Sequence, residues 1–413
     1  MTVMYREQDA QRYASLVVRQ GIRVQPGQAM IIRAQVDCVD FVRLLTQEAY
    51  QAGASEVVVF YSDQQLDRLR YQYAAQEVLD NPSDWSVRVT TDLLEKGACV
   101  VSLTSADPDG FLGLDMGRVG RALNAQKIIS RPFREQIDKK ENQWNIVGVP
   151  SAGWAKKVFP DDTPQRAVEK LWDAIYHAMR LDQEDAAAAW EAHNAAIQQR
   201  CQLLNQSGVV TLKLTSGLGT DLTLDLAEQP IWEGGAGATV GGVLFHPNMP
   251  TEEVFTAPHR ARVNGQVYSS MPLNYQGTLI EGMRFTFRDG LVVDHDARQG
   301  KEALDLMLAV DEGSRRLGEV ALVPYGSLIQ EAGVLFYNTL FDENASCHLA
   351  LGSSYVSNSD GALELSREQR LERGLNESVS HVDFMFGTQD LSVVGVRADG
   401  STLQIFRDGQ WAI

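Results

Sequence analysis

Cysteine is scarce in this 413-residue sequence. The chain has only four cysteines, which lie far apart and form no CxxC pair: Cys38, Cys99, Cys201 and Cys347. A disulfide scaffold needs a much higher cysteine content, so this class of small extracellular protein is excluded. We therefore expect free thiols in a reducing compartment.

Basic residues and long apolar runs are also lacking. Lysine and arginine number 37 against 54 aspartates and glutamates, which gives a net charge of −17 and argues against a nucleic-acid partner. No stretch reaches the ~18 apolar residues that a membrane helix needs. The charged start, MTVMYREQDAQRY, lacks the apolar core of a signal peptide. These features predict a cytoplasmic protein that binds neither nucleic acid nor membrane.

Several well-known catalytic motifs are missing as well. The sequence contains no HExxH, no GxSxG and no GxxxxGK[ST], and the glycines at 113, 117 and 120 do not form GxGxxG. A zincin helix, a nucleophile elbow and a nucleotide-phosphate loop are therefore not indicated.

The length and the pattern of the chain predict two domains, divided at residues 205 and 206. In residues 1–205, apolar strands alternate with helical stretches, which favours an α/β domain with a mostly parallel sheet. Residues 206–413 alternate apolar and polar positions around turn signals, which favours an α+β domain rich in antiparallel strands. The strands expected in the first domain are 30–36, 56–61, 86–91, 98–105 and 145–151.

Acidic and imidazole side chains recur in four separated segments of the second domain. The segments are PTEEVFTAP, LGEVALVPYG, DENASCHLALGSSY and SHVDFMFG, and they contain Glu253, Glu319, Glu343, His348, Tyr355, His381 and Asp383. We expect the four carboxylates and two imidazoles to converge on a pair of divalent metal ions, and the domain to carry a metal site.

Strand periodicity limits which of these side chains can meet. In SHVDFMFG, His381 and Asp383 share one face of a strand, either as metal ligands or as an aspartate that orients a histidine. Glu319 lies in a strand that reads as buried on both faces, so its carboxylate needs a partner unless it reaches solvent at the strand end. Only one of Glu252 and Glu253 can point into a site, and the sequence does not choose between them.

The spacing in DENASCHLALGSSY suits a different structure. Glu343 and His348 are five residues apart, which favours a turn that enters a helix, and the spacing of seven to Tyr355 corresponds to two helical turns unless Gly352 ends the helix. Cys347 is not expected to act as a nucleophile with His348, because adjacent residues rarely face each other.

Together, these segments resemble those of the M29 family of metallopeptidases, the group of aminopeptidase T, aminopeptidase S and PepS. The resemblance covers essentially the whole chain. It implies a cytoplasmic, usually dimeric, two-metal aminopeptidase that acts on short peptides with a free N-terminus. It also implies ligand roles for Glu253, Glu319, His348, His381 and Asp383, with Glu343 as a further acidic candidate and Tyr355 as a site tyrosine.

Two-metal chemistry gives these residues roles that can be tested. Carboxylates and imidazoles suit Zn, Co or Mn, and we expect Glu319 or Asp383 to bridge the ions. Tyr355 is expected to donate a hydrogen bond to the developing oxyanion, and Glu319 or Glu343 to carry a proton to the leaving amine. Two alternatives remain open: a small-ligand-binding protein without turnover, and a two-metal hydrolase of another amide or ester bond.

Overall fold

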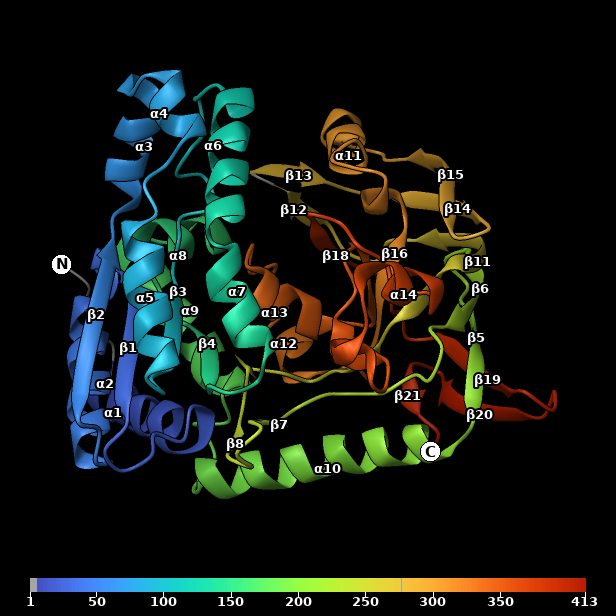
Figure 1. Cartoon of the computed structure of the whole chain (residues 1–413), viewed down its shortest axis with the longest axis horizontal. Helices are drawn as coiled ribbons and strands as arrows, with labels where there is room; N and C mark the ends of the chain where they lie inside the picture. The colour runs from blue at the N-terminus through green and yellow to red at the C-terminus, as the bar shows by residue number, and fades with distance from the viewer. Residues whose placement is uncertain (1–5, 276) are drawn as a thin grey trace. The chain divides into compact units, whose positions relative to one another are not determined.

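The chain folds into two compact units (Figure 1), described here from a computed structural model for residues 6–275 and 277–413. The first unit extends to Glu191 and also contains Ala236–Pro250, and the second contains Ala192–Gly235 and Thr251–Ile413. The division therefore lies inside helix α10 (Ala186–Gln206), whereas the sequence placed it at the end of that helix. Within the described residues, no helix is long and apolar enough to cross a membrane.

The first unit is built around a five-stranded parallel sheet with the strand order β2-β1-β3-β4-β9. Its strands are β1 (Ala29–Gln35), β2 (Glu56–Ser62), β3 (Cys99–Thr104), β4 (Trp144–Gly148) and β9 (Asn248–Met249), and β7 (Gly237–Ala238) pairs with β8 (Leu244–Phe245). The helices are α1 (Glu7–Leu16), α2 (Val39–Gln51), α3 (Gln64–Tyr73), α4 (Gln76–Asp80), α5 (Trp85–Glu95), α6 (Met116–Ile129), α7 (Arg131–Asp138), α8 (Ala152–Val158) and α9 (Pro164–Ala178). The predicted α/β class of this half of the chain is confirmed.

One strand prediction in this unit was wrong. Residues 86–91 were expected to form a strand, but they belong to helix α5. The apolar–polar alternation of SVRVTT resembles a strand over six residues, yet the buried positions Val87, Thr90 and Leu94 follow helical spacing. Leu94 packs with Ile31 and Val100 of the sheet, so tertiary burial overrode the local pattern.

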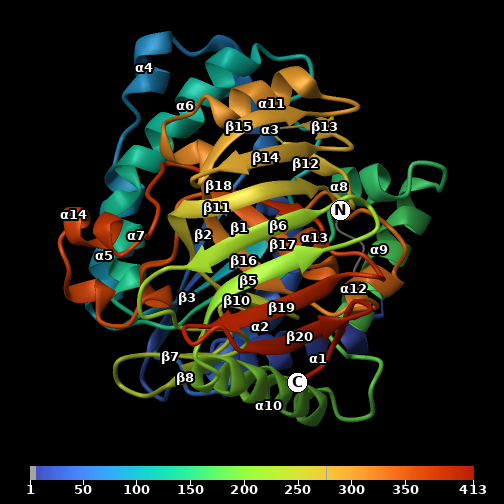
Figure 2. The same cartoon turned by 90° about the vertical axis from the view of Figure 1, so that its right-hand side faces the viewer.

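The second unit contains an eight-stranded antiparallel sheet with the order β15-β14-β11-β6-β5-β19-β20-β21. Figure 2 shows these strands one below another, from orange β15 to red β20. Their bounds are β5 (Val209–Thr215), β6 (Asp221–Leu226), β11 (Pro258–Tyr268), β14 (Arg284–Arg288), β15 (Leu291–Asp296), β19 (Ser392–Arg397), β20 (Thr402–Arg407) and β21 (Gln410–Trp411). The predicted antiparallel character of this half is confirmed.

A second, four-stranded antiparallel sheet has the order β10-β16-β17-β18. These strands are β10 (Val254–Thr256), β16 (Leu317–Leu322), β17 (His348–Gly352) and β18 (His381–Met385). Other elements of the unit are β12 (Leu273–Tyr275), β13 (Thr278–Ile280), α11 (Lys301–Leu308), α12 (Leu328–Glu331), α13 (Thr339–Asp342) and α14 (Arg367–Glu372), together with short 3₁₀ turns.

One face of the four-stranded sheet is apolar. Its side chains belong to a single hydrophobic core, and they are Val254, Val320, Leu322, Leu349, Leu351 and Phe384. Burial of this face fixes the register of all four strands, because a slip by one residue would exchange the two faces. The fixed register therefore also fixes which side chains lie next to one another on the opposite face of the sheet.

The helix expected between His348 and Tyr355 is not present. Residues 348–352 form strand β17, which ends at Gly352. Leu349 and Leu351 alternate with His348 and pack into the core, so the five residues satisfy the strand period. The spacing of seven residues to Tyr355 had suggested helical turns only because no strand partner was known.

Gly352 can be replaced only at a large cost in stability. Its φ is +121°, and a Cβ there would overlap the carbonyl oxygen of Ser380, the residue directly before β18. We expect Gly352→Ala to lower the free energy of unfolding by about 3 kcal/mol or more. The control Gly361→Ala has φ +68° and no atom within 4 Å of the new Cβ, and should cost only about 1 kcal/mol. Urea unfolding measures both, and equal losses would contradict the steric argument.

Candidate metal centre

The polar face of the four-stranded sheet gathers the predicted histidines and acids. Glu319 of β16 pairs with Ala350 of β17, which pairs with Asp383 of β18. His348 lies two residues before Ala350, and His381 lies two residues before Asp383. Directly paired residues and residues two apart share a face of a sheet. Four of the candidate side chains therefore point to the same side.

The structure distinguishes Glu252 from Glu253, which lie directly before β10 and point their side chains toward different neighbours. The carboxylate Oε2 of Glu253 lies 3.1 Å from Nε2 of His348. Glu252 turns away, and its Oε2 lies 3.7 Å from Nε2 of His193. Glu253 is thus the member of the pair that reaches the cluster.

Glu319 lies between the two imidazoles. Its Oε1 is 3.3 Å from Nε2 of His348, and its Oε2 is 3.6 Å from Nε2 of His381. His381 Nε2 is also 3.3 Å from Oδ1 of Asp383. One donor atom each from Glu253, Glu319 and His348 fits within 4.8 Å of the others, which is a spacing that a single ion can span.

Both imidazoles are oriented by backbone carbonyls. The Nδ1 atom of His348 lies 3.2 Å from the carbonyl oxygen of Ser346, and Nδ1 of His381 lies 2.7 Å from that of Ser353. A proton on Nδ1 satisfies these contacts and leaves the Nε2 lone pair directed at the carboxylates. Such outer contacts are how proteins fix the tautomer of a histidine that binds metal.

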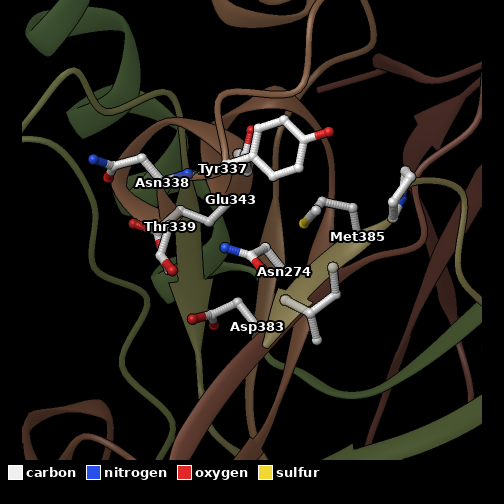
Figure 3. Close-up of a pocket in the computed structure, with 10 residues that line it drawn as sticks. Asn274, Tyr337, Asn338, Thr339, Glu343, Asp383 and Met385 are labelled. Carbon is white, nitrogen blue, oxygen red and sulfur yellow. Dashed lines mark hydrogen bonds between the residues drawn. The ribbon is translucent and has the colours of Figure 1, made fainter. Parts of the chain in front are cut away.

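Glu343 reaches the cluster from outside the sheet. It lies in a 3₁₀ turn, Glu343–Ala345, directly after α13. Burial raises the pKa of Glu343 well above its ordinary value, and the negative charges of Asp383 and Glu253 raise it further. Glu343 and Asp383 line the same pocket (Figure 3). The acid is therefore electrostatically part of the cluster.

Asn344 is a positioning residue that the sequence did not reveal. It is fully buried; its Oδ1 accepts a hydrogen bond from the backbone N–H of Glu252 at 2.7 Å, and its Nδ2 donates to the carbonyl of Leu340 at 3.0 Å. It thereby ties the segment that carries Glu253 to the turn that carries Glu343. Only its place beside Glu343 hinted at a role, because an asparagine in a polar run gives no burial signal.

Tyr355 stands at the open side of the cluster. Its ring centroid lies 5.3 Å from that of His381 and 5.7 Å from that of Phe255, and 49% of the residue remains exposed. The pKa of its phenol is nevertheless raised well above the ordinary value, first because the phenol loses water beside the cluster and then because Glu319 and Asp383 repel a negative charge there. The phenol therefore keeps its proton and remains a hydrogen-bond donor.

The cluster carries an excess of negative charge. Burial raises the pKa of Glu319. Burial opposes charge on the imidazoles, but Glu253 and Glu319 raise the pKa of His348 well above its ordinary value, and Asp383 helps to raise that of His381 to about 10. In the absence of a metal ion, the buried carboxylates therefore favour protonated, positively charged forms of His348 and His381. A cation of higher charge would satisfy the same groups better.

The donor types fit a divalent metal rather than a thiolate-bound ion. All the converging donors are carboxylate oxygens and imidazole nitrogens, which suit Zn, Co or Mn. Cys347 points elsewhere: its Sγ lies 3.2 Å from the carbonyl oxygen of Val323, and burial raises its pKa to about 12. It is suited neither to bind metal nor to act as a nucleophile.

The fold and this cluster together define a candidate metalloenzyme, and comparison with known proteins places it in a family. The model of the family described as "Thermophilic metalloprotease (M29)" matches residues 6–411. The chain therefore belongs to the M29 peptidase family, as the resemblance of its motifs implied.

Named relatives extend over almost the whole chain. Aminopeptidase AmpS of Bacillus subtilis is 41% identical over 400 residues, which cover 97% of each chain. Aminopeptidase T of Thermus thermophilus is 43% identical and covers 98% of this chain and 99% of its own. The solved structure of wild-type AmpT from Thermus thermophilus superposes with a TM-score of 0.93 at 42% identity, and covers 98% of this chain and 100% of its own.

Proposed function

We propose that this chain is an aminopeptidase that uses two divalent metal ions to release the N-terminal residue of short peptides. The observation that carries the proposal is the convergence of Glu253, Glu319 and His348 on one face of a sheet that also bears His381 and Asp383. Membership of a peptidase family favours this function over a ligand-binding protein without turnover.

Charge balance supports two ions rather than one. The ligands proposed are Glu253, Glu319, Glu343, His348, His381 and Asp383. The four carboxylates of this set carry four negative charges, and two divalent ions carry four positive charges once both imidazoles are neutral. Glu319, whose carboxylate oxygens lie near both histidines, and Asp383 would each help to hold the ions.

When bound, two such ions would supply Lewis acidity and would make a water molecule nucleophilic near neutral pH. The protein residues would position the peptide and move protons. Tyr355 would donate a hydrogen bond to the carbonyl oxygen as negative charge develops there. Glu319 or Glu343 would carry a proton to the nitrogen of the leaving amine. A carboxylate that faces the α-ammonium group would restrict cleavage to the first residue.

Hydrolysis of aminoacyl-p-nitroanilides tests the function. We expect turnover of substrates with a free amine, none of the N-acetylated counterparts, loss with a chelator, and recovery with Zn, Co or Mn. A panel of carboxylic and phosphate esters, assayed in parallel, tests the rival hydrolases. Faster metal-dependent turnover of any of these than of the nitroanilides would overturn the assignment.

We also propose that the enzyme is a cytoplasmic homodimer, as the family resemblance implies. Sedimentation equilibrium would test the association, because a single species at the mass of one chain would contradict it.

Tyr355→Phe removes the proposed oxyanion donor and little else. We expect kcat to fall by about 10²–10³-fold with KM nearly unchanged and both ions retained, because the hydrogen bond matters most in the transition state. Tyr325→Phe is the matched control: Tyr325 is 40% exposed in the same unit and should show wild-type kinetics. Unchanged turnover of Tyr355→Phe with full metal content would remove Tyr355 from the mechanism.

A further inference from the structure

A small pocket opens directly beside the metal cluster. Glu343 and Asp383 form part of its lining, so a molecule in this pocket touches two of the proposed ligands (Figure 3). Met385 follows Asp383 on the same face of β18 and forms another wall. Figure 3 shows the side chains of Asn274 and Asp383 pointing toward the side on which Thr339 lies.

The wall formed by residues 337–339 is held rigidly in place. The buried carboxylate of Asp342 accepts hydrogen bonds from the backbone N–H groups of Phe336 at 2.7 Å and of Asn338 at 2.9 Å. The side chain of Asn338 in turn accepts one from the N–H of Leu340 at 3.2 Å, as the cap of α13. The shape of the pocket is therefore set before any ligand arrives, which lowers the cost of binding.

The lining combines apolar and neutral polar groups with acids. Pro272, Leu273 and Met385 supply apolar surface, and Asn274 and Thr339 supply neutral polar groups. Every charged residue of the lining is acidic, and among the described residues that line the pocket there is no lysine or arginine. Because bound cations would offset the charges of Glu343 and Asp383, a neutral side chain can enter this environment, whereas a carboxylate would lose water without any cationic side chain of the lining to replace it.

We propose that this pocket receives the side chain of the substrate's N-terminal residue, and that Asn274 and Thr339 determine which residues fit. The inference rests on the proposed aminopeptidase function, because the pocket adjoins Glu343 and Asp383, two of the ligands proposed for the ions that would act on the scissile bond. It predicts a preference for neutral N-terminal residues, and discrimination against aspartate and glutamate.

Charge reversal at the pocket wall gives the sharpest test. Thr339 is exposed, so Thr339→Lys is expected to fold, and it places a cation where the wild-type lining has none. We expect the ratio of kcat/KM for Glu-p-nitroanilide to that for Leu-p-nitroanilide to rise by at least about tenfold. Thr402→Lys adds the same charge at an exposed position of β20 and should leave the ratio at the wild-type value.

A size change provides a second test that involves no charge. Thr339→Trp fills the pocket and should lower kcat/KM for Phe-p-nitroanilide relative to Ala-p-nitroanilide by about tenfold or more. Thr402→Trp serves as its control, and circular dichroism and metal content are measured for every variant.

The outcomes separate the two proposals. Wild-type protein that hydrolyses no free-amine substrate, with metal bound, overturns the aminopeptidase function. The pocket assignment alone is overturned if the wild type is active and both Thr339 variants fold, but their Glu/Leu and Phe/Ala ratios of kcat/KM stay within about twofold of the wild-type values. Equal shifts in the Thr402 controls also overturn it, because they would show that the effect of charge or bulk does not depend on the pocket.

Discussion

Glu319→Gln is expected to lower kcat/KM for an aminoacyl-p-nitroanilide by at least about 10³-fold and to reduce the metal content of the purified protein. Glu319 lies between His348 and His381, and its two oxygens approach both imidazoles. Glutamine keeps the shape but offers only one oxygen and no negative charge, so it would hold a divalent ion less tightly and cannot carry a proton. Steady-state kinetics and elemental analysis measure the two effects.

A matched control separates this effect from a general loss of negative charge. Glu312 lies seven residues earlier, with its side chain 78% exposed beside Arg316. Exposed ion pairs contribute at most about 1 kcal/mol, so Glu312→Gln should keep wild-type activity and metal content. If Glu319→Gln keeps both as well, Glu319 has neither a ligand nor a catalytic role.

Removal of metal with a chelator is expected to abolish activity and to lower the melting temperature. Without cations, the buried carboxylates of Glu253, Glu319 and Asp383 contact the imidazoles of His348 and His381, which can offset only two of their three negative charges. An ion present at a thousandfold excess over its Kd stabilises the folded state by about 4 kcal/mol. Differential scanning calorimetry before and after chelation measures the loss, and added Zn, Co or Mn should restore both properties.

The variant His348→Ala tests whether the stabilisation arises at this cluster. It removes an imidazole that contacts two of the acids, so chelation should change its melting temperature much less than that of the wild type. Elemental analysis of the wild-type holoenzyme should give two ions per chain. One ion per chain would contradict the two-metal proposal, and identical melting curves with and without chelator would contradict a metal centre at this cluster.

Strand periodicity predicted much of the arrangement of the candidate site. His381 and Asp383 were expected on one strand face, and both lie on the same face of β18. Glu319 was expected on a fully buried strand with a partner for its charge, and every residue of β16 is buried, with His348 as one partner. These expectations needed only the period of two along a strand and the cost of burying a lone carboxylate.

Local patterns failed where a neighbour in space decided the structure. The segment after Cys347 was expected to form a turn and a helix. The spacings of five residues from Glu343 to His348 and of seven from His348 to Tyr355 do not by themselves indicate a strand. The segment forms β17 because β16 and β18 lie on either side of it. The prediction for residues 86–91 made the reverse error, a strand in place of a helix. Their six alternating residues match a strand, but the buried residues of α5 follow helical spacing.

The sequence alone determined the chemistry of this protein: which acids and imidazoles are present, the pairs that share a strand face, and the family to which the motifs belong. Tertiary structure decided that Glu253 rather than Glu252 reaches His348, that Asn344 ties the segment of Glu253 to the turn of Glu343, and that a pocket adjoins Glu343. The physical reason is that side-chain period is a local property of the chain, whereas strand pairing joins residues far apart in sequence, and its register is fixed only when a common apolar face is buried.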